Sequence, residues 1–125
     1  MAHRAKRSRE KRRAHRLAWR LIDFMETNFQ WRIRFMPLQR DVRARKSIGF
    51  EADEIIVGAT LADRHLLVLD PGFEDLFAVL IHECLHAMLS EASEAKVLHL
   101  EKLVRRHLTA RQARAFIFIL NVRLT

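Results

Sequence analysis

Apolar side chains recur with helical spacing in several stretches of the chain. Between residues 14 and 29 they return every three or four positions, which predicts a helix with one buried face. A second helix is predicted after Asp70-Pro71, because Asp can cap a helix and Pro suits its first position. We expect this helix to begin at residue 71 or 72 and to end near residue 89.

Two more helices are predicted in the last third of the chain. Ser93 is suited to cap the first of them, which should end near residue 107. Thr109 followed by Gln112 matches the capping-box pattern and predicts a last helix that ends near residue 121.

The last predicted helix contains a continuous apolar run, Phe116–Leu120. Packing of this run into the core is one interpretation. The other is a contact face between two copies of the chain, because exposed patches of this kind usually mark contacts. The sequence leaves both interpretations, and the oligomeric state, open.

Short extended segments lie between the first two helices. Residues 31–35 alternate apolar and charged side chains, which predicts a half-buried strand that ends before Pro37. Residues 39–54 are polar and predict a loop, whereas residues 55–57 begin a second extended stretch and residues 64–69 predict a third. We therefore expect an α+β fold, in which a small antiparallel or mixed sheet of two or three short strands precedes the C-terminal helices.

Composition narrows the class of protein. The chain has 125 residues, half of them hydrophobic, which suits one domain with a modest core. The single cysteine, Cys84, rules out an intrachain disulfide. The chain lacks an apolar run long enough to span a membrane, and its charged N-terminus lacks the apolar region of a secretory signal. These features predict a cytoplasmic protein without a membrane partner.

Positive charge is concentrated at the N-terminus. The first twenty residues hold nine Lys or Arg and one acid, Glu10, which accounts for the whole net charge of +8. Residues 1–13 lack an apolar face, so we expect a flexible basic arm before a single domain at residues 14–125. The arm is expected either to bind nucleic acid or another polyanion, or to remain a solvated tail.

The candidate chemistry lies in the sequence His82-Glu83-Cys84-Leu85-His86. Residues four apart share one face of a helix, so His82 and His86 can both present a nitrogen to one zinc ion. Glu83 lies about 100° round the helix from His82, where it suits a general base acting on metal-bound water. Apolar neighbours predict that this helix is buried, and buried imidazoles need partners that a metal can supply. Cys84 faces away and is interpreted as a core residue.

A catalytic zinc site of this kind needs a third protein ligand and an open fourth position. Leu89 and Ala92 stand where the metzincin pattern has Gly and His, which excludes that branch. The remaining candidates are Glu91, Glu94, His99 and Glu101. We expect Glu94 to be the ligand, because it follows the turn that brings the next helix back, with Glu101 and Glu91 as alternatives. An acid in the first helical turn also favours the helix dipole, which is the other explanation for Glu94.

These residues resemble the small zincin-type metallopeptidases, nearest to the gluzincin-like proteins often found in phage and prophage genomes. The strand and turn at residues 66–71, the helix at residues 80–87 and the pair Ser93 and Glu94 carry the resemblance, which covers about residues 55–107. It implies a zincin-like fold, one zinc ion and hydrolysis of peptide bonds in a peptide or protein substrate. It also implies that an edge strand at residues 64–69 runs beside the substrate.

The chain departs from this family in one respect, since it contains no tyrosine. A Tyr that polarises the oxyanion in some relatives is therefore absent, and His99, His107 and Arg105 are candidates to replace it. The competing hypothesis is a nucleic-acid-binding or regulatory protein with a structural or degenerate zinc site. A fourth protein ligand closing the site would favour that hypothesis.

Overall fold

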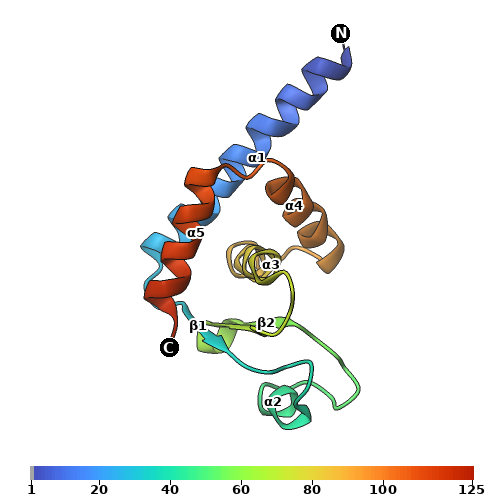
Figure 1. Ribbon diagram of the computed structural model, residues 1–125, viewed down its shortest axis with the longest axis vertical. Helices are drawn as coiled ribbons and strands as arrows, with labels where there is room; N and C mark the ends of the chain where they lie inside the picture. The colour runs from blue at the N-terminus through green and yellow to red at the C-terminus, as the bar shows by residue number, and fades with distance from the viewer. Residues whose placement is uncertain (1) are drawn as a thin grey trace.

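The computed structural model describes residues 2–125, with side chains from residue 4 onward. The elements are α1 (Ala2–Thr27), β1 (Arg32–Phe35), α2 (Val42–Ser47), β2 (Gly58–Leu61), the 3-10 turn η1 (Ala62–Arg64), β3 (Leu66–Leu69), α3 (Leu76–Met88), α4 (Glu94–Arg106) and α5 (Ala110–Arg123). Five helices and one small sheet make a mixed α+β fold, as the sequence predicted (Figure 1). Among the described residues, no helix is both long enough and apolar enough to cross a membrane.

The sheet is mixed, with β3 in the middle. Its order is β1-β3-β2; β1 runs parallel to β3 and β2 runs antiparallel to it. All four residues of β3 are buried, as expected of a strand covered on both faces. The expectation that residues 64–69 form the edge strand beside a substrate is therefore wrong. The edge strand next to α3 is β2.

The helix α3 lies at the centre of the molecule. The sheet lies on one side of it, and α1, α4 and α5 surround the others (Figure 1). Its Leu80, Ile81 and Leu85 are almost fully buried and share one core with side chains of α1, β3, α4 and α5. Truncating one of these residues to Ala would cost about 2–5 kcal/mol, so the helix has little freedom to shift.

The first helix is longer than predicted. The sequence predicted a helix from residue 14 after an irregular arm, but α1 begins at Ala2 and is continuous to Thr27. Arg, Lys, Ala and Glu fill its N-terminal half, and all are good helix formers even without an apolar face. Residue 1 of the expected arm lies outside the described residues.

The helix α3 begins later than predicted. Its cap is Asp75, whose carboxylate accepts a hydrogen bond from the amide of Ala78 at 3.0 Å. Asp70 instead accepts from the amides of Gly72 and Gln39, each at 2.8 Å. The Asp70 carboxylate therefore does not cap a helix. It closes a turn and joins the end of β3 to the loop after β1.

The polar stretch predicted as a loop contains the short helix α2. Asp41 caps it, and the buried guanidinium of Arg45 donates to the carbonyl of Leu38 at 2.7 Å. The extended stretch predicted to begin at residues 55–57 becomes a strand three residues later, because β2 is Gly58–Leu61.

The predictions for the last two helices are confirmed at their N-termini. Ser93 accepts a hydrogen bond from the amide of Lys96, and Thr109 and Gln112 form the predicted capping box. The apolar run of α5 is partly packed in the core and partly exposed, so each of its two interpretations, core and contact face, applies to some of its residues. Phe116 and Ile119 are buried, and the side chains between them, Ile117 and Phe118, are exposed.

Candidate metal centre

The helices α3 and α4 form a hairpin that brings their polar faces together. A tight turn follows α3, in which the amide of Ala92 donates to the carbonyl of Leu89 at 3.0 Å, and Ser93 then caps α4. On α4, Val97 and Val104 are buried in the core that α3 shares. Glu94 and Glu101 are two turns apart, so they lie on one face of α4.

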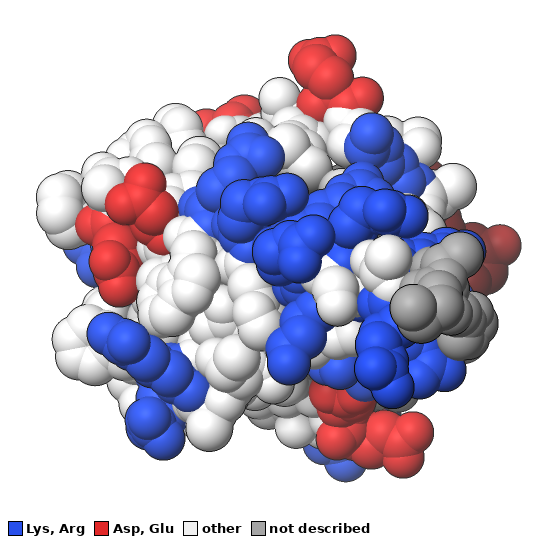
Figure 2. All heavy atoms as spheres, turned by 90° about the horizontal axis from the view of Figure 1, so that it is seen from above, with Lys and Arg blue, Asp and Glu red and all other residues white. Residues whose placement is uncertain are grey.

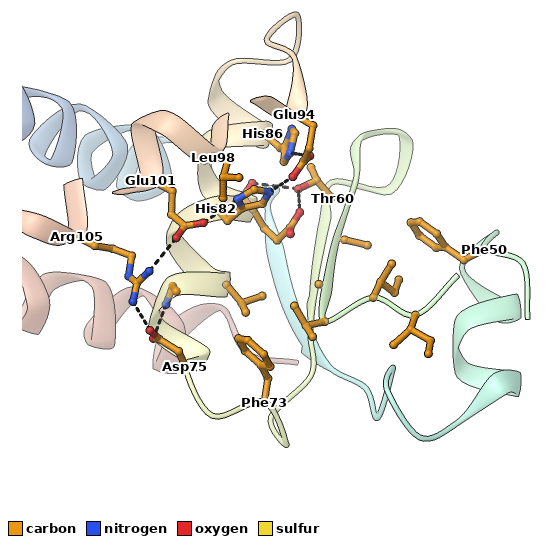
Figure 3. A pocket seen from close by; sticks show the side chains of 18 of the residues that line it. Phe50, Thr60, Phe73, Asp75, His82, His86, Glu94, Leu98, Glu101 and Arg105 are labelled. Carbon is orange, nitrogen blue, oxygen red and sulfur yellow. Dashed lines mark hydrogen bonds and ion pairs between the residues drawn. The ribbon is translucent and has the colours of Figure 1, made fainter. Parts of the chain in front are cut away.

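Two imidazoles of α3 meet one carboxylate of α4. His82 Nε2 lies 2.6 Å from Glu94 Oε1, and His86 Nε2 lies 2.7 Å from Glu94 Oε2 (Figure 3). The ligand atoms of the three residues all lie within 4.8 Å of one another. Two imidazole nitrogens and one carboxylate are the donor set of His₂Glu zinc sites, so these residues fit a zinc ion. All three residues are those that the sequence nominated.

The carboxylate of Glu94 is held in its ionised form. Partial burial alone would raise its pKa, but hydrogen bonds and positive charge from His86 and His82 outweigh that effect and lower the pKa. A carboxylate must be deprotonated to bind a metal, and the imidazoles that lower this pKa must lose their own positive charge to bind the same ion.

A second carboxylate of α4 contacts the other ring nitrogen of His82. Glu101 is buried, and its Oε1 lies 2.9 Å from His82 Nδ1. This contact occupies one ring nitrogen and leaves Nε2 to face Glu94. Glu101, an alternative ligand in the sequence analysis, therefore contacts His82 and does not belong to the group around Glu94. Glu91 and His99 are exposed and do not belong to the group around Glu94.

An ion-pair network supports Glu101. Arg105 donates to Glu101 Oε2 at 3.1 Å and also forms an ion pair with Asp75, the cap of α3 (Figure 3). The C-terminal end of α4 is thus tied to the start of α3. The i, i+4 spacing of Glu101 and Arg105 was a local signal for the first pair. No local signal pointed to Asp75, which lies 30 positions from Arg105 in the chain.

Glu83 lies beside the two histidines, against the edge strand. It is 6% exposed, and Thr60 Oγ1 donates to its Oε1 at 2.8 Å. Burial raises the pKa of Glu83, opposed by the Thr60 hydrogen bond and the charges of His82 and His86. A buried carboxylate of raised pKa next to a metal-ligand set is typical of a general base.

A glycine allows the edge strand to approach Glu83. A Cβ on Gly58 would lie 2.5 Å from Val79 Cγ1 and 3.0 Å from Glu83 Oε2. Any side chain there would push β2 away from α3, and the Thr60 hydroxyl would move with it. Neither Gly58 nor Thr60 is predictable from the sequence, because nothing local links them to residues more than twenty positions away.

A cavity of about 870 Å³ opens in front of these residues. Polar side chains form one part of its lining, and the backbone of β2 borders it. The apolar part of the lining includes Phe50, Ile55, Ile56, Val57 and Phe73, of which Figure 3 labels the two phenylalanines. A cavity of this size accommodates several side chains of a bound ligand, far more than an ion requires.

Cys84 is fully buried in the core, as predicted. Burial, followed by the neighbouring charge of Glu83, raises the pKa of its thiol above the usual range, which makes it a poor nucleophile and ligand.

Comparison of the chain with family models, curated proteins and solved structures finds no match. Its chemistry is therefore inferred from the arrangement of its own side chains.

Proposed function

We propose that this chain is a zinc-dependent metallopeptidase, in which His82, His86 and Glu94 hold one zinc ion and Glu83 is the general base. The observation that carries the proposal is the approach of two Nε2 atoms to opposite oxygens of one carboxylate, at 2.6 and 2.7 Å. His₂Glu sets of this kind bind catalytic zinc and leave a fourth position open.

Zinc in such a set supplies a Lewis acid and lowers the pKa of a water in the open position to about 7. Glu83 accepts the proton of the attacking water and delivers it to the leaving amine. Thr60 holds Oε1 of this carboxylate, so Oε2 is the oxygen left to carry the proton. Burial makes Glu83 a stronger base than an exposed carboxylate, which favours this role.

The edge strand β2 and the apolar part of the cavity lining favour an extended peptide as substrate. β2 pairs with β3 on one side only, and the cavity runs along it. An unpaired strand edge offers backbone donors and acceptors to an added peptide strand. The apolar part of the lining, which includes Phe50 and Phe73, suits large apolar side chains of that peptide.

A closed structural zinc site is less well supported. Closed sites use four protein ligands, whereas the described residues supply three to this group, His82, His86 and Glu94. Cys84, the one cysteine of the chain, is buried in the core and does not belong to the group.

Metal analysis combined with hydrolysis of a casein or peptide substrate tests the proposal. Wild-type protein should contain one zinc per chain, and Glu94→Ala should lose most of it. Glu83→Gln should retain zinc and lose about 10²–10⁴-fold in the rate of hydrolysis, the range for removing a general base. The matched control is Glu91→Gln, on an exposed glutamate in the turn before α4, and this variant should retain both zinc and hydrolysis. Wild-type protein that remains free of zinc after purification with added zinc contradicts the proposal.

A further inference from the structure

The surface of α1 is strongly basic. Nine Lys or Arg lie between residues 4 and 20, and all nine side chains are exposed. Figure 2, seen from the end of the molecule where α1 begins, shows Lys and Arg side chains gathered in one broad cluster. The other 105 residues balance in charge, so the first twenty residues carry the net charge of the protein.

Part of this charge forms a row on one side of the helix. Arg9, Arg13, Arg16 and Arg20 recur at intervals of four, three and four residues, which places them on the same face. That face points about 100° round the helix from the buried side, which carries Ala14, Leu17 and Leu21. Arg12 lies at its border, and we call these five arginines the basic face of α1. The row spans about 16 Å at 1.5 Å per residue.

The basic face is not neutralised by the rest of the protein. Within the described part of the chain, none of its five arginines has an acidic partner within 4.0 Å. The one acid of the segment, Glu10, pairs with Arg106 of α4 at 4.0 Å, away from the row. On the adjacent helix α5, Arg111 lies over the ring of Trp19 and adds a further positive charge beside the row.

The N-terminal part of α1 also extends beyond the packed body of the protein (Figure 1). Ala14 is the first residue of the helix that is buried; residues 4–13 are exposed or half-buried. In this part the basic side chains surround the helix, since Arg4, Arg7 and Lys11 add charge on other sides. A free helix with positive charge on both flanks can contact phosphates on both walls of a groove.

We propose that α1 binds double-stranded DNA through phosphate contacts made by its basic face. This binding function is additional to the proposed peptidase and does not depend on it. Of the described residues that line the cavity at the candidate metal centre, none belongs to α1. The two surfaces are therefore separable by mutation.

Duplex DNA fits this helix better than other nucleic acids do. Single-strand binding uses several exposed aromatic rings as stacking platforms, but residues 4–18 contain no Phe, Tyr or Trp, and Arg111 lies over one face of the Trp19 ring. The major groove of B-DNA is wide enough for an α-helix, whereas that of duplex RNA is deep and narrow. The contacts are to phosphates, so we expect little dependence on base sequence.

The salt dependence of binding to a labelled duplex of mixed sequence gives a quantitative test. Five phosphate contacts predict a slope of about −4.5 in a plot of log K against log salt concentration. Affinity should then fall about 500-fold between 50 and 200 mM salt. The variant Arg9→Gln/Arg13→Gln/Arg16→Gln should have a slope of about −1.8 and a fall of about 12-fold over the same range.

Two matched variants separate the basic face from net charge and from folding. Arg40→Gln/Arg43→Gln/Lys46→Gln removes the same charge from an exposed surface around α2 and should keep the wild-type slope. Replacing Arg9, Arg13 and Arg16 by Lys keeps the charge and should also keep the slope. A slope that drops equally in the α2 variant, or that drops in the Lys variant, overturns the proposal.

Two further ligands test the identity of the partner. The protein should bind the duplex more tightly than a single strand of the same length, and more tightly than polyglutamate of equal charge. Equal affinity for either competitor overturns the assignment to duplex DNA. The zinc content of the Gln variant at residues 9, 13 and 16 should equal that of wild type, so failure of this proposal is distinct from failure of the proposed peptidase.

Discussion

At the scale of single residues, the candidate site depends on how His82 is held between two carboxylates. Glu94 contacts Nε2 and Glu101 contacts Nδ1, at 2.6 and 2.9 Å. The two acids lie on one helix but have different environments, since Glu94 is mostly exposed and Glu101 is buried and paired with Arg105. We infer that Glu94 is the zinc ligand and that Glu101 is a positioning residue.

Glu101→Gln should therefore weaken zinc binding without abolishing it. The amide oxygen can still accept from His82 Nδ1, but the negative charge that makes the imidazole a better donor is lost. Removing such a partner typically lowers metal affinity 10- to 100-fold. Competition with a zinc chelator measures the change.

Two variants control this measurement. Glu94→Gln should lower zinc affinity much further, and Glu91→Gln should leave it unchanged. An affinity of Glu101→Gln equal to wild type would show that this carboxylate has no effect on His82.

Glu83 predicts a pH dependence of stability in the zinc-free protein. Burial raises its pKa above the ordinary value of 4.5, so the folded state binds this proton more tightly than the unfolded state. Its contribution is fully present below pH 4.5 and is lost as pH rises through the raised pKa. Glutamine cannot ionise and still accepts from Thr60, so Glu83→Gln should be more stable than wild type at neutral pH.

Thermal melts of both proteins between pH 4 and pH 8, in the presence of a chelator, measure this difference. The Tm advantage of Glu83→Gln should shrink as pH falls towards 4.5. An advantage that grows as pH falls has the wrong sign for a buried carboxylate of raised pKa.

At the scale of elements, the sequence predicted the helix starts that depend on hydrogen bonds between residues close together in the chain. The caps of α4 and α5 were predicted because Ser93 and the Thr109–Gln112 pair bond to amides within three residues. The start of α3 was not, because Asp70 also bonds to the amide of Gln39, 31 positions away. Such a contact exists only once the chain is folded.

The same distinction explains the prediction of the site. The spacing of His82 and His86, and the short turn before Glu94, are local features. The contacts of Glu83 with Thr60 and of Arg105 with Asp75 join residues 23 and 30 positions apart, and no pattern in the sequence encodes them. The ligand group was therefore predictable and its supporting contacts were not.

The packing of β2 on α3 gives a prediction for Gly58. A methyl group there would overlap Val79 Cγ1, so Gly58→Ala should destabilise the protein by about 1–3 kcal/mol, the usual cost of overpacking. Urea denaturation measures the loss. The Gly58→Ala substitution should also reduce hydrolysis, because β2 carries the Thr60 hydroxyl that donates a hydrogen bond to Glu83.

A double-mutant cycle with Val79→Ala provides the control. Removing the Val79 methyl groups relieves the overlap, so Gly58→Ala should cost less in that background than in wild type. Equal costs in the two backgrounds would mean that the strand does not rest against Val79.

At the scale of the whole molecule, the proposed functions lie on different parts of the fold. The candidate metal centre is formed by α3, α4 and the edge of β2, whereas the basic charge is carried by α1 (Figures 1 and 3). The shared hydrophobic core links them, since α1 and α3 contribute to one cluster that includes Leu21 and Leu85. Substitutions on the surface of α1 should therefore leave the metal centre unchanged, and substitutions of its buried side should disturb both.

The central claim is a zinc ion with three protein ligands and one open position. X-ray absorption at the zinc edge of the wild-type protein tests it most directly. We predict two imidazole nitrogens at about 2.0–2.1 Å, with oxygen donors at about 2.0–2.2 Å from Glu94 and from solvent. Zinc bound by four protein ligands, by a sulfur at about 2.3 Å, or not at all would contradict it.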